Sequence, residues 1–302
     1  MNKIIITGGS GFVGKNLIGY LKDLFNNIVT LNRHELSEIS HEAFKDVNVI
    51  IHLAGKAHDL KNVSSPNEYY QVNFELTKKL YDTFLKSNTP KFIFISSVKA
   101  VSDSINGVLT ENIIPNPQTH YGKSKLMAEE YIQAQPLPEG KSYYILRPCM
   151  IHGPGNKGNL NLLYKLVKKG IPYPLAGFNN KRSFLSVENL CFVINELITR
   201  DDIPGGIYQV ADDEALSTNE VVSILASSLN RKPKLWKVPS DIITFFARIG
   251  DRLHLPLTTE RLNKLTESYV VSNQKIKKAL NKELPLSAME GLKITTNSFN
   301  QN

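Results

Sequence analysis

The chain has 302 residues, of which 41% are hydrophobic and 21% are charged. This composition is typical of a soluble globular protein and excludes a fibrous or intrinsically disordered chain, and no apolar run approaches the ~18 to 20 residues that span a bilayer. The net charge is +8, with the basic residues spread along the chain, so we expect small anionic ligands, and neither nucleic acid nor a membrane, as partners.

The chain contains two cysteines, Cys149 and Cys191, and they lack the paired spacing of a zinc site or a redox couple. We therefore expect a reducing, cytoplasmic environment and no metal. The first residues already belong to a predicted strand, so we expect no signal peptide.

Short β-branched runs alternate with amphipathic helical stretches over the first two hundred residues. Strands are predicted at 3–7, 27–31, 48–55, 91–97, 142–148 and 206–212, and helices at 15–25 and 74–86. In the first helix, Leu17, Leu21 and Leu24 recur on one face. The alternation predicts an α/β fold with a doubly wound parallel sheet.

Beyond Arg147 the sequence changes character, with Gly/Pro-rich loops in "IHGPGNKGN" and "GIPYPLAGFNNKR" and mainly helical patterns after Ser217. We expect a smaller C-terminal substrate-binding lobe at the edge of the sheet where ligands of open α/β folds bind. The expected division is a Rossmann-type dinucleotide-binding domain at 1–150 plus about 183–212, and a lobe at 151–182 and 213–302.

The stretch "TGGSGFVG" at 7–14 joins the first strand directly to the first helix. The spacing can be read as Gly8-x-x-Gly11-x-x-Gly14 or as Gly9-x-Gly11-x-x-Gly14. Glycines here allow a sharp turn and a close approach of a pyrophosphate to the helix N-terminus. The strand, turn and helix in succession predict a dinucleotide site, and a merely flexible turn is the alternative.

The second strand ends in "TLNRHE", where an Asp or Glu would bind the ribose 2′-hydroxyl of NAD. Asn32 is uncharged, and Arg33 could pair with a 2′-phosphate. This favours NADP over NAD, although Glu35 lies nearby and Arg33 pointing into solvent is the alternative.

Tyr121 and Lys125 in "HYGKSKLMAEEY" stand four residues apart at a predicted helix start, so they share one face. An ammonium group close to a phenol, together with a positively charged oxidised nicotinamide, favours the phenolate, so we expect a lowered pKa for Tyr121 and a role in acid/base chemistry. Ser96 and Ser97 end a predicted strand, where a hydroxyl could hydrogen-bond a reacting oxygen.

The motifs "TGGSGFVG", "HLAG", "ISSV", "YGKSK" and "LRP" occur in the order and spacing of a known family. The chain resembles the extended short-chain dehydrogenase/reductases, the NAD-dependent epimerase/dehydratase family, over nearly its whole length. The resemblance implies Ser97, Tyr121 and Lys125 as catalytic residues. With the residues above, the cofactor-binding set is Gly8, Gly11, Phe12, Val13, Gly14, Asn32, Arg33, Leu53, Ala54, Gly55, Asn73, Ser96, Tyr121, Lys125 and Pro148.

The same resemblance implies a UDP-sugar substrate. The segment 155–190 looks like that of enzymes acting at C4 of UDP-linked 6-deoxy-N-acetylhexosamines, which implies Ser97, Asn159, Arg182 and Arg261 as substrate-binding residues. Arginine suits a diphosphate because its guanidinium binds phosphate bidentately. For Arg182 and Arg261 the alternative is a solvated surface position.

The sequence favours reduction over epimerisation and dehydration. Dehydratases carry an Asp-Glu pair beside the catalytic hydroxyl, and "SSVKAVSD" has none. Asn32 and Arg33 suit NADPH, which an exchanging reductase uses, so we expect a 4-keto-6-deoxy-N-acetylhexosamine reductase of surface-polysaccharide synthesis. A UDP-hexose 4-epimerase is the alternative, and a non-catalytic NADP-binding sensor a remote one.

Four further expectations concern single residues and assembly. Asn73 resembles a site-ordering asparagine of the family, with a helix N-cap as the alternative. His52 fits a buried strand and is interpreted as a packed histidine, whereas His58 and His152 are expected in loops near the site. Lys99 could contact the substrate or extend into solvent. The resemblance also implies a homodimer formed through the helices 74–86 and 124–135.

Overall fold

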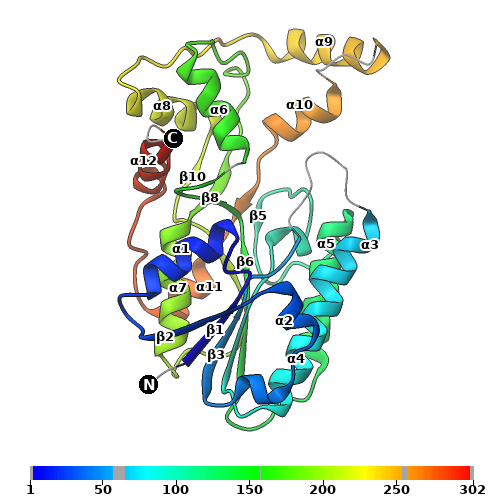
Figure 1. Ribbon diagram of the computed structural model, residues 1–302. Coiled ribbons are helices and arrows are strands. Elements are labelled where there is room, and N and C mark those ends of the chain that lie inside the picture. The colour runs from blue at the N-terminus through cyan, green and yellow to red at the C-terminus, as the bar shows by residue number, and fades with distance from the viewer. Residues whose placement is uncertain (1–2, 57–64, 157, 254–257, 300–302) are drawn as a thin grey trace.

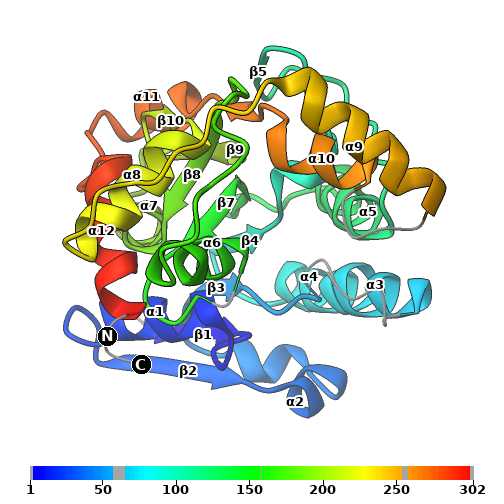
Figure 2. The same ribbon diagram turned by 90° about the horizontal axis from the view of Figure 1, so that it is seen from above.

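The computed structural model describes residues 3–56, 65–156, 158–253 and 258–299. Its centre is a parallel sheet of six strands (Figures 1 and 2). In spatial order the strands are β2 (Asn27–Leu31), β1 (Lys3–Thr7), β3 (Val47–His52), β4 (Lys91–Ile95), β6 (Ser142–Pro148) and β9 (Gly206–Val210). The strand order reverses on either side of β1, which is the place where such sheets open a crevice for ligands. The predicted Rossmann-type fold class is confirmed.

Helices cover both faces of the sheet, and each face has its own apolar core. One face carries α1 (Phe12–Leu21), α7 (Val187–Thr199) and α11 (Gln274–Leu280). The other face carries α2 (Arg33–Ser37), η1 (His41–Phe44), α3 (Pro66–Tyr70), η2 (Gln71–Glu75), α4 (Leu76–Lys86) and α5 (His120–Ala134). Strands buried on both faces explain why their sequences are continuous apolar runs such as "VIIH" and "FIFI".

Two predicted helices had wrong boundaries, the first at both ends and the second at its start. The first helix begins at Phe12 and ends at Leu21, and its last predicted turn is instead a tight turn into β2 that leaves Leu24 57% exposed. The second predicted helix does not begin at Phe74, because α3, η2 and α4 run on from Pro66 to Lys86. Its middle segment, η2, is a π-helix, which period-based reasoning cannot detect.

The C-terminal lobe sits beyond the carboxyl ends of the strands (Figure 1). Its sheet consists of β7 (Met150–His152), β8 (Arg182–Ser186) and β10 (Ala215–Leu216). Its helices are α6 (Asn159–Lys168), α8 (Thr218–Ser228), α9 (Ser240–Leu253), α10 (Thr259–Thr266) and α12 (Ala288–Phe299). Three short elements lie near the joint, namely η3 (Val98–Ala100) and the parallel pair β5 (Val108–Leu109) and β11 (Val270–Val271).

The chain returns to the sheet between the lobe helices. Val271, Ile276 and Leu280 are buried in the core that α1 and α7 share with the sheet. This segment was expected in the lobe, and its apolar side instead packs on the Rossmann side, because β11 and α11 lie against β5 and β9. Nothing in the described part of the chain is a helix with the length and apolarity needed to traverse a bilayer.

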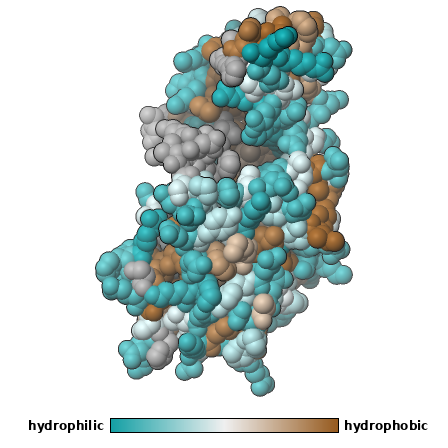
Figure 3. All heavy atoms as spheres, turned by 90° about the vertical axis from the view of Figure 1, so that its right-hand side faces the viewer, coloured by the Kyte–Doolittle hydropathy of each residue, from teal (hydrophilic) through white to brown (hydrophobic). Residues whose placement is uncertain are grey.

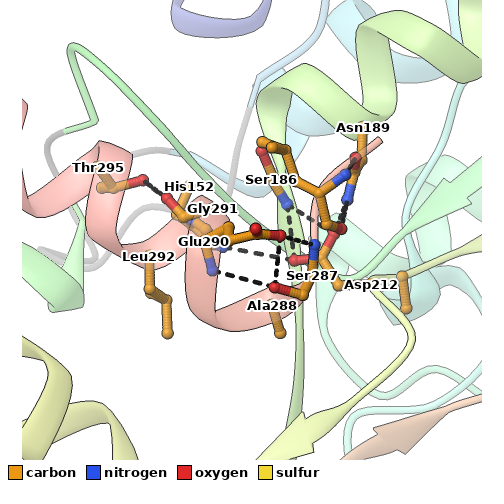
Figure 4. Close-up of polar contacts among 12 residues, drawn as sticks. His152, Ser186, Asn189, Asp212, Ser287, Ala288, Glu290, Gly291, Leu292 and Thr295 are labelled. Atoms are coloured by element: carbon orange, nitrogen blue, oxygen red, sulfur yellow. Dashed lines mark hydrogen bonds and ion pairs between the residues drawn. The ribbon is translucent and has the colours of Figure 1, made fainter. Parts of the chain in front are cut away.

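A buried polar cluster joins the lobe to the sheet (Figure 4). The carboxylate of Asp212 accepts hydrogen bonds from the backbone N–H of Ser186 at 3.0 Å and from Asn189 Nδ2 at 2.7 Å. His152, expected in a loop near the site, lies in β7, and its Nδ1 is 2.8 Å from Thr295 Oγ1 on α12. His152 is therefore part of the joint, while His58 lies outside the described residues.

Candidate active site

The glycine turn is held against the end of β3. Gly8 has φ of +72°, and a Cβ atom there would lie 2.6 Å from the backbone nitrogen of Ala54. A Cβ on Gly14 would lie 2.3 Å from the oxygen of Gly8, which itself accepts a hydrogen bond from Gly11 N at 3.0 Å. Only glycine fits these two positions, so the flexible-turn interpretation does not describe this loop.

The N-terminus of α1 faces a cavity of about 580 Å³. Gly11 is the N-cap residue, and no side chain caps the first turn. The free N–H groups of a helix N-terminus attract anionic phosphate groups. The cavity is lined by Gly8, Gly9, Ser10, Gly11, Thr30, Leu31, Asn32, Arg33, Glu35, Leu36, Leu53, Ala54, Gly55, Val72 and Leu76. These residues fit the adenosine and phosphate portion of a dinucleotide.

At the end of β2, Asn32 acts as the N-cap of α2. Its side chain accepts hydrogen bonds from the backbone of His34 at 2.9 Å and Glu35 at 3.1 Å, and the Glu35 carboxylate accepts from Asn32 N at 2.6 Å. Asn32 and Glu35 are therefore both engaged in a capping box. Arg33 is the exposed cation at this rim of the cavity.

The predicted catalytic residues converge beyond β4. Tyr121 lies in the first turn of α5, whose N-cap Thr119 accepts from Gly122 N at 3.2 Å. The Tyr121 hydroxyl shares a hydrogen bond with Ser97, which directly precedes η3. Lys125 extends from the next turn of α5, and its Nζ donates to the carbonyl oxygen of Ile95 at 2.9 Å. The structure thus brings Ser97, Tyr121 and Lys125 together.

Lys125 also connects the catalytic residues to the cofactor cavity. A Cβ atom on Gly55, which lines the cavity, would lie 3.1 Å from Lys125 Nζ and 3.1 Å from Asn73 Oδ1. The absence of a side chain at Gly55 therefore lets the ammonium reach the edge of the cavity. A hydroxyl pair of a bound ribose could accept hydrogen bonds from this ammonium.

The pKa of Tyr121 reflects its burial. Burial raises it above the usual value of 10, the hydrogen bond with Ser97 opposes this change, and Lys125 is not among the causes. Burial also lowers the pKa of Lys125 to about 8, with Glu129 acting in the opposite direction. In the protein alone Tyr121 is therefore a protonated acid at neutral pH, and the expected lowering, which included the charge of an oxidised nicotinamide, stays a prediction for the complex.

Asn73 anchors the catalytic helix from within the π-helical segment η2. Its Oδ1 accepts from Lys56 N at 2.7 Å, and its Nδ2 donates to Ser124 Oγ at 3.0 Å. Ser124 Oγ in turn donates to the carbonyl oxygen of Tyr121 at 2.8 Å. The N-cap interpretation of Asn73 was wrong, because the residue lies inside a continuous helical run. Its position matches a site-ordering role.

Beneath the site lies a buried ion pair that the sequence did not reveal. Arg147 Nη2 lies 2.5 Å from Glu129 Oε2, and the Ser96 hydroxyl donates to the same carboxylate. Both charged side chains are at most 3% exposed. Glu129 follows Lys125 by one helical turn and so lies on the same face of the helix. An acidic residue on that face, together with Arg147 in a buried strand, was the signal in the sequence for this ion pair. Ser96 therefore directs its hydroxyl into this pair.

The predicted substrate residues lie on the lobe side. Arg182 Nε donates to the carbonyl oxygen of Glu267 at 2.9 Å, and Nη2 donates to that of Lys264, so its guanidinium binds the C-terminal end of α10. Arg261 lies exposed in α10 itself. Asn159 opens α6, with its side chain outside the described atoms. Their contacts to a diphosphate stay predictions.

Lys99 and the remaining cofactor residues complete the site. Lys99 Nζ donates to the carbonyl oxygen of Asp103 at 2.7 Å and lies 4.2 Å from the ring centre of Tyr269. Burial lowers the pKa of Lys99, and the nearby Arg182 adds to this effect. Lys99 therefore does not extend into solvent. Pro148 ends β6 in a buried position, and Phe12 and Val13 are half-buried at the start of α1.

The parallel sheet carries a glycine-lined cavity that fits a dinucleotide. Next to this cavity lie a hydrogen-bonded Ser–Tyr pair and a buried lysine. This combination is typical of NAD(P)-dependent enzymes of the oxidoreductase type. The model of the NAD dependent epimerase/dehydratase family matches residues 4–211. The chain belongs to this family and is an enzyme of the extended short-chain dehydrogenase/reductase type.

Comparison with known proteins gives 4-epimerases together with related dehydrogenases and reductases, among them a GDP-6-deoxy-D-mannose reductase of Pseudomonas aeruginosa, 26% identical over 74% of this chain and 79% of the relative. The chain is 31% identical to a UDP-glucose 4-epimerase of Vibrio cholerae, over 99% of this chain and 95% of the relative. It is 28% identical to N-acetyl-alpha-D-glucosaminyl-diphospho-ditrans,octacis-undecaprenol 4-epimerase of Escherichia coli O157:H7, over 92% and 85%. The fold is similar to that of UDP-N-acetylglucosamine 4-epimerase from Bacillus cereus, with a TM-score of 0.79, 20% identity and full coverage of both chains.

Proposed function

We propose that this protein oxidises and reduces C4 of a UDP-linked sugar, and that the overall reaction is 4-epimerisation. The observation that carries the proposal is the hydrogen bond between Ser97 and Tyr121 beside the Lys125 ammonium. Epimerisation is supported by the two relatives aligned over 99% and 92% of the chain, both of which are named 4-epimerases. The proposed reaction is therefore 4-epimerisation, the alternative in the sequence analysis, and the reductase favoured there becomes the second candidate.

In this mechanism, Tyr121 accepts the proton of the C4 hydroxyl when the sugar is oxidised and returns it when the 4-keto sugar is reduced. Ser97 hydrogen-bonds the same oxygen and holds it at Tyr121. Lys125 places a positive charge at the cavity edge, which stabilises the phenolate form of Tyr121, the form that accepts the proton in oxidation and that remains after the proton is returned in reduction. A bound nicotinamide supplies the hydride acceptor and donor. Burial raises the pKa of Tyr121 in the protein alone, and the positive charge that a bound oxidised nicotinamide would add acts in the opposite direction.

A 4-keto-sugar reductase, with 4-keto-6-deoxy-N-acetylhexosamine as substrate, is the second candidate. It is favoured by Arg33, an exposed cation at the rim of the cavity, with the nearby Glu35 carboxylate already bound to Asn32. A cationic rim suits the 2′-phosphate of NADP. Arg182, Arg261 and Asn159 would bind the UDP diphosphate in either reaction. A non-catalytic sensor is disfavoured, since Ser97, Tyr121 and Lys125 are all present.

Turnover with and without added dinucleotide separates the two candidates. An epimerase interconverts UDP-glucose and UDP-galactose, or their N-acetylated forms, with no net change in absorbance at 340 nm. A reductase consumes one NADPH per molecule of 4-keto sugar. Stoichiometric oxidation of NADPH, with no interconversion of UDP-hexoses, would overturn the epimerase proposal.

The Tyr121→Phe substitution tests the mechanism common to both reactions. Removing the hydroxyl eliminates proton transfer, so kcat should fall about 10²- to 10⁴-fold. The Kd for the dinucleotide, measured by fluorescence titration, should change little. Tyr131→Phe is the control on the same helix, because the Tyr131 hydroxyl donates to Asp82 away from the site. Full turnover by Tyr121→Phe would contradict the mechanism.

We also propose a homodimer formed through α4 and α5, and a reducing, cytoplasmic location consistent with the free, buried thiols of Cys149 and Cys191. Helices α4 and α5 pack side by side on one face of the sheet. Light scattering coupled to gel filtration gives the assembly state directly.

A further inference from the structure

Helix α9 has an apolar stripe that nothing in the described structure covers. Its buried positions Ile243, Ala247 and Gly250 face α10. A second apolar row lies beside them at the helical spacing i, i+3, i+4, i+7 and i+11. This row consists of Ile242, Phe245, Phe246, Ile249 and Leu253, of which Phe245 is 60%, Phe246 58% and Leu253 63% exposed.

The helix occupies the outer end of the lobe, away from the sheet (Figures 1 and 2). Figure 3 views the molecule from the side on which α9 projects and shows hydrophobic patches beside hydrophilic ones at this end. Arg248 and Arg252 are exposed beside the stripe on the side away from α10, where Asp241 is exposed as well. An exposed row of aromatic and aliphatic side chains bordered by arginines is the pattern of a helix that lies at a membrane interface.

The fold concentrates positive charge at the same end. Residues 165–182 and 231–264 together contain thirteen Lys and Arg against three Asp and Glu, a net charge of +10, whereas the other residues contain 23 and 25. The two segments pair through the bridges Tyr173 to Leu235 and Leu175 to Lys237. Arg231 also donates to the carbonyl oxygen of Lys168 at 2.5 Å. Charge that is spread along the sequence is thus gathered in space.

This charge identifies the kind of surface that fits the stripe. Two copies meeting through α9 would bring two strongly positive ends together, and the repulsion opposes that contact. An anionic bilayer attracts the same charge, while the phenylalanines enter the boundary between headgroups and acyl chains. The position of the stripe also suits a bilayer, because α9 protrudes from the lobe and a flat surface can contact it.

We propose that α9 and the basic segments 165–181 and 231–237 dock the protein on the surface of an anionic lipid bilayer. This is peripheral binding. It departs from the sequence-based expectation of no membrane partner, which considered only spanning segments. It does not depend on the proposed function, since no residue of the Ser97, Tyr121 and Lys125 site takes part.

The test is co-sedimentation of the full chain with unilamellar vesicles of phosphatidylcholine alone or with 30% phosphatidylglycerol. We expect binding to the anionic vesicles, at least about tenfold weaker binding to the neutral ones, and a decrease with rising salt. Trp236, the single tryptophan, is 59% exposed and lies four residues before α9, so its emission should shift to shorter wavelength on binding.

Two variants separate the apolar and the electrostatic contributions. Phe245→Ser with Phe246→Ser should weaken binding at least about tenfold, and so should Lys232→Gln with Lys234→Gln and Lys237→Gln. The matched controls are Leu24→Ser, which removes an exposed apolar side chain at 57% exposure far from the lobe, and Lys22→Gln with Lys45→Gln and Lys86→Gln. The controls should bind as the unmodified protein does.

Thermal unfolding and turnover of a soluble UDP-sugar should be the same in all these variants, which shows that they are folded. Equal pelleting with neutral and anionic vesicles, or unchanged binding of the double phenylalanine variant, would overturn the proposal. A shift from dimer to monomer in that variant, without vesicle binding by the unmodified chain, would also overturn it and assign the stripe to a second copy.

Discussion

At the scale of single residues, His52 is a buried histidine whose neighbours require it to be neutral. Its Nδ1 lies 2.7 Å from Thr7 Oγ1, and its Nε2 lies 2.9 Å from Thr77 Oγ1. Thr77 donates its own hydrogen to Asn73 O, and Thr7 accepts from Ala54 N. In the neutral ring, Nε2 then donates to Thr77 and Nδ1 accepts from the Thr7 hydroxyl, and a second ring proton on Nδ1 would displace that hydroxyl hydrogen. Its interpretation as a packed histidine agrees with this geometry.

The stability of the protein should therefore fall in mild acid. Burial, assisted by the charge of Lys125, lowers the pKa of His52 to about 3, whereas an unfolded histidine titrates near 6.5. Below about pH 6.5 His52 is protonated in the unfolded chain but not in the folded chain. The free energy of unfolding therefore keeps decreasing until the pH approaches 3. Between pH 7 and pH 5 the free energy of unfolding should decrease by about 2 kcal/mol from this residue. Urea denaturation at both pH values measures it.

The comparison variant is His52→Gln, which cannot titrate. It will be less stable at pH 7, but its free energy of unfolding should depend less on pH by the same ~2 kcal/mol. His34→Gln changes a histidine whose side chain is 80% exposed and should keep the pH dependence of the unmodified protein. An unaltered pH dependence in His52→Gln would show that another group is responsible.

At the scale of elements, α1 contains two glycines in opposite environments. A Cβ on Gly14 would lie 2.3 Å from Gly8 O and 2.6 Å from Gly9 Cα, whereas a Cβ on Gly19 would meet nothing within 4 Å. Gly14→Ala should push α1 away from the glycine turn, lower stability by about 1–3 kcal/mol and weaken dinucleotide binding at least about tenfold. Gly19→Ala should raise stability by about 0.5–1 kcal/mol without changing binding.

Fluorescence titration with NADH and NADPH, together with urea denaturation, measures both effects. Because the two substitutions are chemically identical and only five residues apart, a general effect of alanine on the helix cannot explain a difference between them. Equal binding by both variants would mean that the glycine turn does not hold the dinucleotide.

Local patterns explain which elements the sequence could predict. The glycine turn, the six strands and the Tyr121–Lys125 pair depend on short-range spacing, and the structure places them as expected. The π-helical segment at Asn73 depends instead on contacts with Lys56 and Ser124, which come from other elements. The pairing of Glu129 with Arg147 likewise joins a helix to a strand. Such contacts between elements have no periodic signature in the chain.

At the scale of the whole molecule, the lobe is held to the sheet by polar contacts as well as by apolar packing. Asn189 on α7 uses both ends of its amide, with Nδ2 donating to Asp212 Oδ1 at 2.7 Å and to Leu286 O at 2.8 Å. Its Oδ1 accepts from Leu286 N at 3.0 Å. Leu286 lies just before α12, so the side chain of Asn189 fixes the entry of the last helix into the lobe.

Asn189→Ala should therefore loosen α12 more than its size suggests. The substitution leaves the Leu286 backbone and one Asp212 contact without a partner, and we expect a loss of about 2–4 kcal/mol of stability. Asn195→Ala on the same helix is the control, because within the described residues Asn195 Oδ1 has no hydrogen-bond partner, and its loss should cost less than about 1 kcal/mol. Hydrogen exchange should show reduced protection at 288–299 in Asn189→Ala alone, because the amide of Asn189 holds the start of that helix. Equal urea midpoints for the two variants, with unchanged exchange in α12, would show that apolar packing of the lobe is sufficient to hold the helix.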